Sequence, residues 1–386
     1  MSGHTLRKIM SQRIAEAGGS LPFDQFMQAA LYEPGLGYYD IKTVFGAQGD
    51  FVTASELGPW SSLAMADLVF NAWQQMGEPD DWVLIEQGSG SGQQLVALLD
   101  ILAQFSMAVP KTVISVEHCA ALRERQARLF EERSLDVRQC SGLDEIEPVE
   151  QVIYYSNELP DAFPVSCFHR KDGAFYERRV AMDGDVFCWH DAQSPMLQSP
   201  EISDDLIAQW PDSYISEWNP GLLAWQQQLS RIITSGFVFT VDYGYSQQEY
   251  YRQARIEGTL LAHLDQTATE VVLEQPGSRD ITAHVDFTAL VQAGRDCGLK
   301  PLLWMSQGGW LAQSPSVQAL IESLAAQNDA TSMHLLAHAK RMLMPFGMGE
   351  VFKLLIQSKG LDAKKPVYLD QFDHLETLLV RHSAGD

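Results

Sequence analysis

The sequence predicts an α/β protein whose mostly parallel sheet is covered by helices on both faces. Three observations support this prediction. Short apolar runs alternate with helix-like segments from residue 82 to residue 241, alternating glycines between Glu86 and Gly92 join the first run to its helix, and the acidic Glu117 ends the second run. Strands that consist of continuous apolar runs are typical of parallel sheets buried between two helical layers.

The elements of this core can be placed in chain order. Strands are expected at 82–85, 112–116, 151–155, 236–241 and 351–356, and helices at 93–105, 120–133 and about 316–344. Two stretches interrupt the alternation. Residues 166–190 indicate a β-hairpin or meander, because turn sequences divide them, and residues 200–232 indicate Trp-rich helices.

The segment before the core is expected to form a cap of helices and loops. Residues 1–30 have the pattern of two short helices, residues 32–59 are a run rich in Gly, Tyr and Pro, and a helix is expected over 61–76. Such long loops in compact domains are often functional. The predicted organisation is an N-terminal cap (1–76), a core (77–360) with insertions at about 166–232 and 245–285, and a C-terminal tail (361–386).

Charge narrows the class of partner. The 386 residues include 27 Lys and Arg against 50 Asp and Glu, a formal net charge of −23. This charge disfavours nucleic acid and anionic membranes, because both are bound through cationic side chains. Residues 141–230 alone hold 16 acidic and 4 basic residues. This acidic block either attracts a cationic partner or is ordinary solvated surface, and the sequence favours neither.

Cysteine usage and hydropathy indicate the compartment. The five cysteines are odd in number and form no CxxC pair, so neither a disulfide framework nor a metal site is predicted. A reducing compartment follows: the cytoplasm of a bacterium, or the mitochondrial matrix if the chain is eukaryotic. No apolar run approaches the ~18–20 residues of a membrane span, so stable membrane insertion is not expected. The basic segment Thr5–Ile14 fits a first helix better than a transit peptide.

The glycine run is the motif that indicates a cofactor. Gly88, Gly90 and Gly92 follow a strand and open a helix, where the backbone can approach a ligand and free N–H groups are available. Glu117 fills the position that binds ribose hydroxyls in such folds. The GxGxG spacing departs from the dinucleotide pattern GxGxxG, and Glu86 suits a cationic ligand such as S-adenosylmethionine (SAM) better than a pyrophosphate. A glycine-rich turn without a ligand is the alternative.

At this point the sequence resembles the MidA family of SAM-dependent methyltransferases, whose mitochondrial members are protein arginine methyltransferases that assist assembly of respiratory complex I. The resemblance implies a class I methyltransferase (Rossmann-like) core with an N-terminal cap and inserted hairpin and helices, SAM as cofactor, and a protein substrate with an exposed arginine. The matching stretches are Phe26–Tyr39, Gly49–Glu56, Glu86–Gly92, Val116–Arg123 with Gln126, Ser156–Val165, Val241–Gly244, Gly258–Leu260, Pro276–Phe287 and Met348–Leu355. The resemblance also places Thr53 and Glu56 over the cofactor, although a plain loop is nearly as well supported.

The acceptor site is expected where the strand at 151–155 ends beside the cofactor crevice. Asn157, Glu158 and Asp161 follow that strand, and Tyr243 ends another strand at the same edge. Two carboxylates could hold a guanidinium bidentately and accept its proton during methyl transfer. The alternative is that Asn157 and Glu158 cap the next helix and that Tyr243 sits in a simple turn.

Departures from the family pattern weaken the prediction of the acceptor more than the prediction of the cofactor. Leu261–Gln266 replaces a run that carries Tyr and His in the family, and this places the acceptor identity in doubt. Three other functions therefore stay open: a SAM-binding assembly protein without catalysis, a small-molecule methyltransferase, and a nucleotide-dependent oxidoreductase, which the GxGxG spacing disfavours. Nothing in the sequence predicts the oligomeric state.

Overall fold

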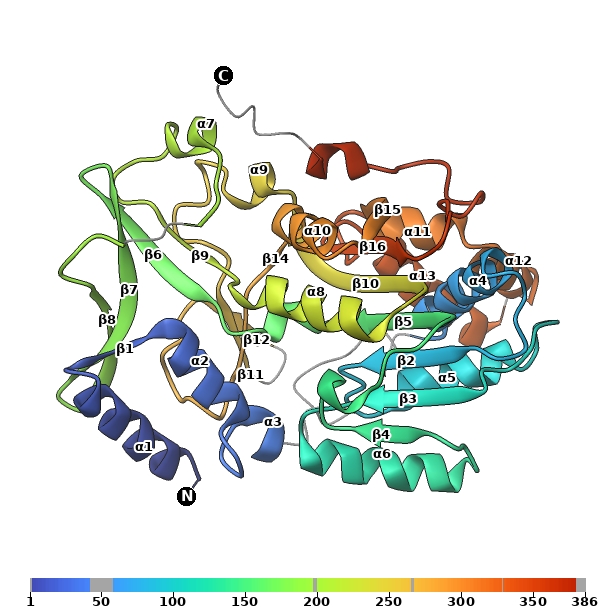
Figure 1. The fold of residues 1–386 in the computed structure, drawn as a ribbon, viewed down its shortest axis with the longest axis horizontal. Coiled ribbons are helices and arrows are strands. Elements are labelled where there is room, and N and C mark those ends of the chain that lie inside the picture. Colours follow the sequence, from blue (N-terminus) through green and yellow to red (C-terminus); the bar gives the residue numbers. More distant parts are fainter. Residues whose placement is uncertain (1, 42–57, 197–199, 265–266, 328, 380–386) are drawn as a thin grey trace.

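The computed structural model describes residues 2–41, 58–196, 200–264, 267–327 and 329–379, and a mixed sheet lies at its centre (Figure 1). The strand order is β15-β16-β10-β5-β2-β3-β4, with the short β14 beside β10. The strands are β2 (Val83–Gln87), β3 (Thr112–Val116), β4 (Arg138–Cys140), β5 (Val152–Asn157), β10 (Gly236–Tyr245), β14 (Val285–Asp286), β15 (Lys300–Ser306) and β16 (Phe352–Lys359).

Strand direction makes the sheet mostly parallel, as expected. β4, β3, β2, β5 and β10 are parallel neighbours, while β16 is antiparallel to both β10 and β15. The strands expected from apolar runs are all present. Strand β15 was not predicted, because Pro301 weakens its strand signal, and the register shifts between Pro301 and Leu303.

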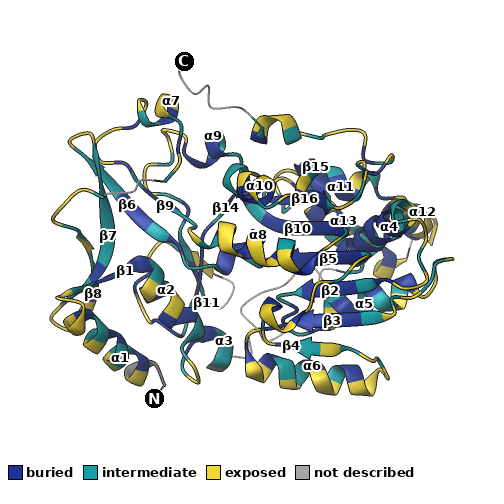
Figure 2. Cartoon of the chain, in the orientation of Figure 1, coloured by how far each residue is buried: buried dark blue, intermediate teal, exposed yellow. Residues whose placement is uncertain are grey.

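Helices cover both faces of the sheet and bury two apolar cores. Along β2, Leu84 joins one core and Ile85 the other, as the two-residue period of a strand requires. The central strands β2, β5 and β10 are accordingly mostly buried in Figure 2. Helices α4 (Trp60–Gln75), α5 (Gln93–Leu102), α11 (Gln307–Gln313), α12 (Pro315–Gln327) and α13 (Ala330–Leu343) contribute to the first core, and α8 (Gly221–Ile232) and α10 (Phe287–Asp296) to the second.

The N-terminal segment joins the first insertion in a second sheet, with order β1-β7-β6-β9 and β8 beside β7. Leu21 of β1 pairs with Val180 of β7, so segments far apart in sequence share one sheet and one apolar cluster. The elements are α1 (Ser2–Glu16), β1 (Ser20–Pro22), α2 (Phe23–Tyr32), α3 (Tyr38–Ile41), β6 (Ser166–Lys171), β7 (Ala174–Asp183), β8 (Val186–Asp191) and β9 (Ile215–Trp218).

A third sheet with order β12-β11-β13 forms from the second insertion. Its strands are β11 (Leu261–Leu264), β12 (Thr267–Thr269) and β13 (Asp280–Thr282). The remaining elements are α6 (Ala120–Glu132), α7 (Asp204–Ile207), α9 (Gln247–Tyr250), η1 (Leu143–Glu145), η2 (Pro160–Ala162) and η3 (Leu375–Leu378). Within the described ranges, no helix is both long and apolar enough to cross a bilayer.

Two predictions need correction. The stretch 200–232 is not helical throughout, because β9 at Ile215–Trp218 pairs with β6 and completes the second sheet. The C-terminal segment is not a plain surface tail either, because Leu369 and Leu378 are buried in the two apolar cores. Both errors arise from long-range packing, which local composition does not reveal.

Candidate active site

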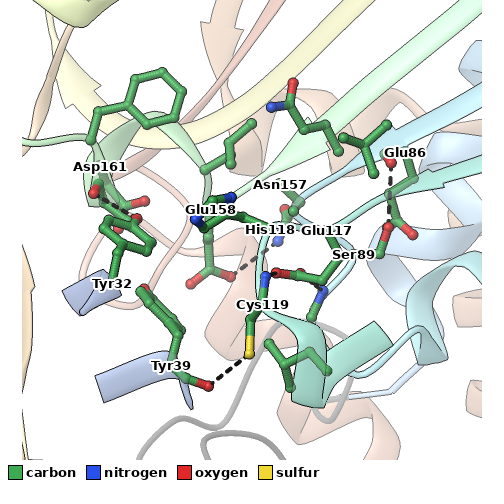
Figure 3. Close-up of a pocket in the computed structure, with 18 of the residues that line it drawn as sticks. Tyr32, Tyr39, Glu86, Ser89, Glu117, His118, Cys119, Asn157, Glu158 and Asp161 are labelled. Carbon is green, nitrogen blue, oxygen red and sulfur yellow. Dashed lines mark hydrogen bonds between the residues drawn. The ribbon is translucent and has the colours of Figure 1, made fainter. Parts of the chain in front are cut away.

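A cavity of about 360 Å³ lies at the carboxyl ends of β2, β3, β5 and β10. In parallel sheets this edge is the usual ligand-binding position. Figure 3 shows Asp161 and Tyr32 toward one end of the cavity, Glu86 and Ser89 toward the other, and Glu158 between them. The cavity therefore brings together the predicted cofactor residues and the predicted acceptor residues.

The glycine loop after β2 forms one wall of the cavity. Gly88 (φ +76°) and Gly90 (φ +51°) line it in left-handed conformations that side chains rarely adopt. Gly92 does not line the cavity. A Cβ at Gly92 would lie 3.1 Å from Gln126 Cγ and 3.3 Å from Phe130, so this glycine permits close packing of the loop against α6.

Buried hydrogen bonds hold the loop in place from behind. Gln126, whose position matched the family pattern, donates from Nε2 to the carbonyl oxygen of Gly90 at 2.9 Å. Ser115 of β3 donates to Gln126 Oε1 at 2.9 Å, and Ser115 Oγ lies 2.9 Å from Ser89 Oγ. These side chains are buried, so the loop conformation is fixed without a ligand.

Glu117 joins the glycine loop to the end of β3. Its Oε2 accepts the N–H of Gly90 at 3.1 Å, and its Oε1 accepts the N–H of Cys119 at 3.0 Å. Burial raises the pKa of the carboxyl above its ordinary value, and the two backbone donors oppose that shift. The residue lines the cavity where a ribose-binding acid is expected.

Glu86 is a second buried acid on the cofactor side. It is 2% exposed, and within the described structure its Oε2 has no hydrogen-bond partner. Burial raises the pKa of Glu86 to about 7. A buried carboxylate with an unpaired oxygen beside a cavity fits a ligand that carries a cationic group, because such a ligand would restore the lost interaction.

The acceptor side is a cluster of acids at the ends of β5 and β10. Asn157 donates from Nδ2 to Glu158 Oε1 at 3.1 Å, and Tyr243 donates its hydroxyl to Asp161 Oδ2. Burial, and next the charge of Asp161, raise the pKa of Glu158 to about 7, and burial raises the pKa of Asp161 to about 6. Within the described structure Asp161 Oδ1 has no partner.

Asp242 was not among the predicted site residues, although it precedes Tyr243 directly. Its Oδ2 accepts the N–H of Asp161 at 3.2 Å and its Oδ1 accepts the N–H of Tyr243 at 2.7 Å. It therefore fixes the backbone of both residues that meet over the cavity. Burial, followed by the charge of Asp161, raises its pKa well above the ordinary range.

The cap contributes residues that the sequence reasoning also missed. Tyr32 and Tyr39 line the cavity, and their rings stack with centroids 5.5 Å apart. Tyr39 donates to Asp280 Oδ1 at 3.1 Å, and Tyr32 donates to the carbonyl of Ala162 at 2.9 Å. The stretches Phe26–Tyr39 and Pro276–Phe287 both matched the family pattern, and this match was the available signal. Thr53 and Glu56 lie outside the described residues.

Fold and site together define the class. A parallel sheet with one antiparallel strand, β16, beside β10, a glycine loop after β2 and an acid after β3 are the features of a class I SAM-dependent methyltransferase. The family model of S-adenosyl-L-methionine-dependent methyltransferases matches residues 64–305, more than half of the chain. The chain belongs to the MidA family of SAM-dependent methyltransferases, and SAM is its cofactor.

Relatives cover nearly the whole chain. The mitochondrial protein arginine methyltransferase NDUFAF7 homolog of Drosophila melanogaster is 26% identical, covering 96% of this chain and 88% of the relative. The mitochondrial protein arginine methyltransferase NDUFAF7 of Homo sapiens is 23% identical, with coverages of 91% and 82%. A Burkholderia thailandensis protein solved with S-adenosyl-homocysteine has a TM-score of 0.87 at 28% identity, covering 97% of both chains.

Proposed function

We propose that this methyltransferase transfers the methyl group to an arginine side chain of a protein substrate. The observation that best supports the proposal is the cluster of Glu158, Asp161 and Asp242 beside the cofactor cavity. Burial raises the pKa of all three carboxyl groups, and the charge of Asp161 adds to the rise for Glu158 and Asp242. Such a cluster is unfavourable when ionised and gains stability from a cation placed among its members.

A guanidinium is the cation whose shape and chemistry fit this cluster. It is planar, stays charged at physiological pH and presents paired N–H donors that match carboxylate oxygens. Asp161, whose buried Oδ1 has no partner within the described structure, and the half-buried Glu158 both line the cavity. We assign these two carboxylates to binding and orienting the guanidinium, with Asn157 and Tyr243 holding them in position.

The same carboxylates can accept the proton that a guanidinium must lose when it is methylated. The guanidinium nitrogen forms a bond to the methyl carbon while the bond from carbon to sulfur breaks, and the nitrogen must then lose a proton. SAM, when bound, supplies the electrophilic methyl group on its sulfonium. An ionised Glu158 is our candidate to accept the proton, because its pKa of about 7 matches the operating range of a general base.

The cofactor wall fits SAM on the residues present. We assign Gly88 and Gly90 to close backbone approach and Glu117 to the ribose hydroxyls. We place the unpaired Glu86 near the cationic end of the ligand. We assign Gly92 to the close packing of the loop against α6 and not to contact with the ligand. Support for an arginine acceptor also comes from the names of the relatives, which are protein arginine methyltransferases.

The test is methyl transfer from labelled SAM into a cell lysate by the purified protein, with mass spectrometry of the labelled product. We expect label on arginine residues of protein, absent when Glu158→Gln replaces the wild type. Label confined to small molecules would refute the protein-arginine acceptor while leaving SAM-dependent transfer intact. SAM binding without any transfer would instead favour an assembly protein.

The role in respiratory complex I assembly that the family resemblance implies is a second part of the proposal. We expect deletion of the gene to reduce assembled complex I in a host that makes this complex, with rescue by the wild type and not by Glu158→Gln. Rescue by both would separate assembly from catalysis.

A further inference from the structure

A second cavity of about 360 Å³ lies beside the first and takes no part in the chemistry described so far. It is bounded by the second sheet and by Arg255, residues 257–261, Glu270 and Val272. Its buried end includes Cys167 and Glu217, and its half-buried walls include Arg178 and Arg255. The cavity therefore combines charged side chains with restricted access to water.

Strand register explains how these groups come together. Asp191 of β8, Arg178 of β7, Cys167 of β6 and Glu217 of β9 are successive cross-strand partners. Residues directly opposite one another in antiparallel strands share a face of the sheet. One row of side chains thus crosses the sheet.

Arg178 carries the positive charge in this row of side chains. Its guanidinium lies over the ring of Trp189, 4.3 Å from the centroid, and burial lowers its pKa. Within the part of the chain that the structure describes, it makes no hydrogen bond or ion pair. The neighbouring Asp191 pairs with His169 and Lys171, and Glu257 acts on Arg178 by its charge without a hydrogen bond within the described structure.

Glu217 does not balance Arg178 either. Its Oε1 accepts the N–H and the hydroxyl of Thr259, at 2.9 and 2.7 Å, and the hydroxyl of Tyr250 at 2.7 Å. A Cβ on Gly258 would lie 2.1 Å from Glu217 Oε2, so glycine is required there. Glu217 therefore stabilises the cavity wall. Asp191 and Glu257 lie near enough for their charges to raise the pKa of Arg178, but within the described structure no carboxylate is hydrogen-bonded to its guanidinium.

The second cavity adjoins the candidate acceptor site. Tyr243 lines the first cavity and Tyr245 the second, both from β10. The ring of His284 lies between these contacts, 5.5 Å from the Tyr243 centroid and 5.1 Å from the Tyr245 centroid. The rings of Tyr243 and Tyr245, one lining each cavity, are thus at most about 11 Å apart, which about three residues of extended chain can span.

We propose that the second cavity binds a carboxylate through Arg178, and that this carboxylate belongs to an acidic side chain of the acceptor protein a few residues from the methylated arginine. The assignment of this carboxylate to the acceptor protein rests on the proposed function. A planar guanidinium held on an aromatic ring offers paired donors that match carboxylate geometry. Glu257 and Glu270 are exposed at the rim and suit a segment that also carries the arginine.

The test uses short fluorescein-labelled Gly-Ser peptides with one central Arg and one Glu, moved through about two to five positions on either side. Matched peptides carry Gln in place of Glu. Binding is followed by fluorescence polarisation in the presence of S-adenosyl-homocysteine, so that the readout does not depend on catalysis. We expect one Glu position to bind about tenfold more tightly than its Gln counterpart.

Arg178→Gln should remove that preference and leave the affinity for the Gln peptide and for S-adenosyl-homocysteine unchanged. Arg128→Gln, an exposed position on α6 that removes the same charge, serves as the control and should preserve the preference. Equal binding of Glu and Gln peptides by the wild type, or equal losses in both variants, would overturn the proposal.

A second experiment tests whether the carboxylate belongs to a peptide or to a small molecule. Glutarate is titrated against the wild type and Arg178→Gln in a thermal-shift assay. Stabilisation that requires Arg178, without any preference for acidic peptides, would overturn the acceptor-protein source. If arginine methylation is absent but the Arg178-dependent peptide preference persists, the proposed function fails while the carboxylate site stands.

Discussion

The two ends of the first cavity differ in how far their polar groups are satisfied. At the cofactor end, Gln126 and Ser115 hold the glycine loop, and both carboxylate oxygens of Glu117 accept backbone N–H groups. At the acceptor end, the buried Asp161 and Asp242 and the half-buried Glu158 lie at one edge of the sheet, and Asp161 Oδ1 has no partner within the described structure. The glycine loop at the cofactor end is preorganised, although Glu86 Oε2 there also lacks a partner within the described structure, whereas the acceptor end is built mainly of acids that a cationic ligand would stabilise.

The largest expected effect tests the acceptor end. Glu158→Gln should lower kcat roughly 100-fold or more, because it removes a carboxylate that orients the guanidinium and accepts its proton. The Kd for SAM should change less than about threefold. Steady-state kinetics and calorimetric titration measure the two quantities. Wild-type turnover in this variant would remove Glu158 from the mechanism.

The next effect concerns stability and tests Glu86. Its folded-state pKa of about 7 lies above the ordinary value of 4.5, so the folded protein binds this proton more tightly than the unfolded chain. The free energy of unfolding therefore falls as pH rises from about 4.5 to about 7 and stays lower above that range. Glu86→Gln should raise the free energy of unfolding at pH 8 by on the order of 2 kcal/mol.

Denaturant unfolding at pH 5 and pH 8 measures this difference, with the exposed Glu131→Gln as control. The stabilisation should appear at pH 8, shrink at pH 5 and be absent in the control. Equal stabilisation at both pH values would contradict an ionisable Glu86 as its cause.

A smaller effect is the pH dependence of acceptor binding. Glu158 and Asp161 carry pKa values of about 7 and about 6, and a bound guanidinium favours their ionised forms. Affinity for an arginine peptide should therefore rise roughly five- to tenfold from pH 5.5 to 7.5 and then level off. Polarisation titrations with Arg peptides and neutral citrulline peptides measure it, and the citrulline peptides should show little pH dependence.

The smallest expected effect tests the cofactor end. Gln126→Leu preserves side-chain volume but removes the hydrogen bonds to Gly90 and Ser115. The glycine loop should loosen, and the Kd for SAM should rise about fivefold with kcat nearly unchanged. A drop in kcat without a change in the Kd for SAM would contradict this prediction, because it would show that Gln126 affects catalysis and not cofactor binding.

The features predicted correctly from the sequence are local ones. The strand Thr112–Val116, the helix that begins at Gln93 and the glycines before it follow from apolar period and turn chemistry over a few residues. The MidA family membership rests on motifs of the same local kind, and the comparisons confirm it.

Individual long-range contacts were not predicted. The sequence placed Asp161 and Tyr243 at the same edge of the sheet but did not indicate their hydrogen bond across 82 positions, nor that of Tyr39 to Asp280 across 241. Arg178 lines a cavity only because β6, β7, β8 and β9 align in one register. Local sequence determined the five core strands that form apolar runs, the glycine loop and the cofactor class, since neighbouring residues specify them. Tertiary structure alone decided which acids share a cavity, because strand register and the packing of distant segments set those positions.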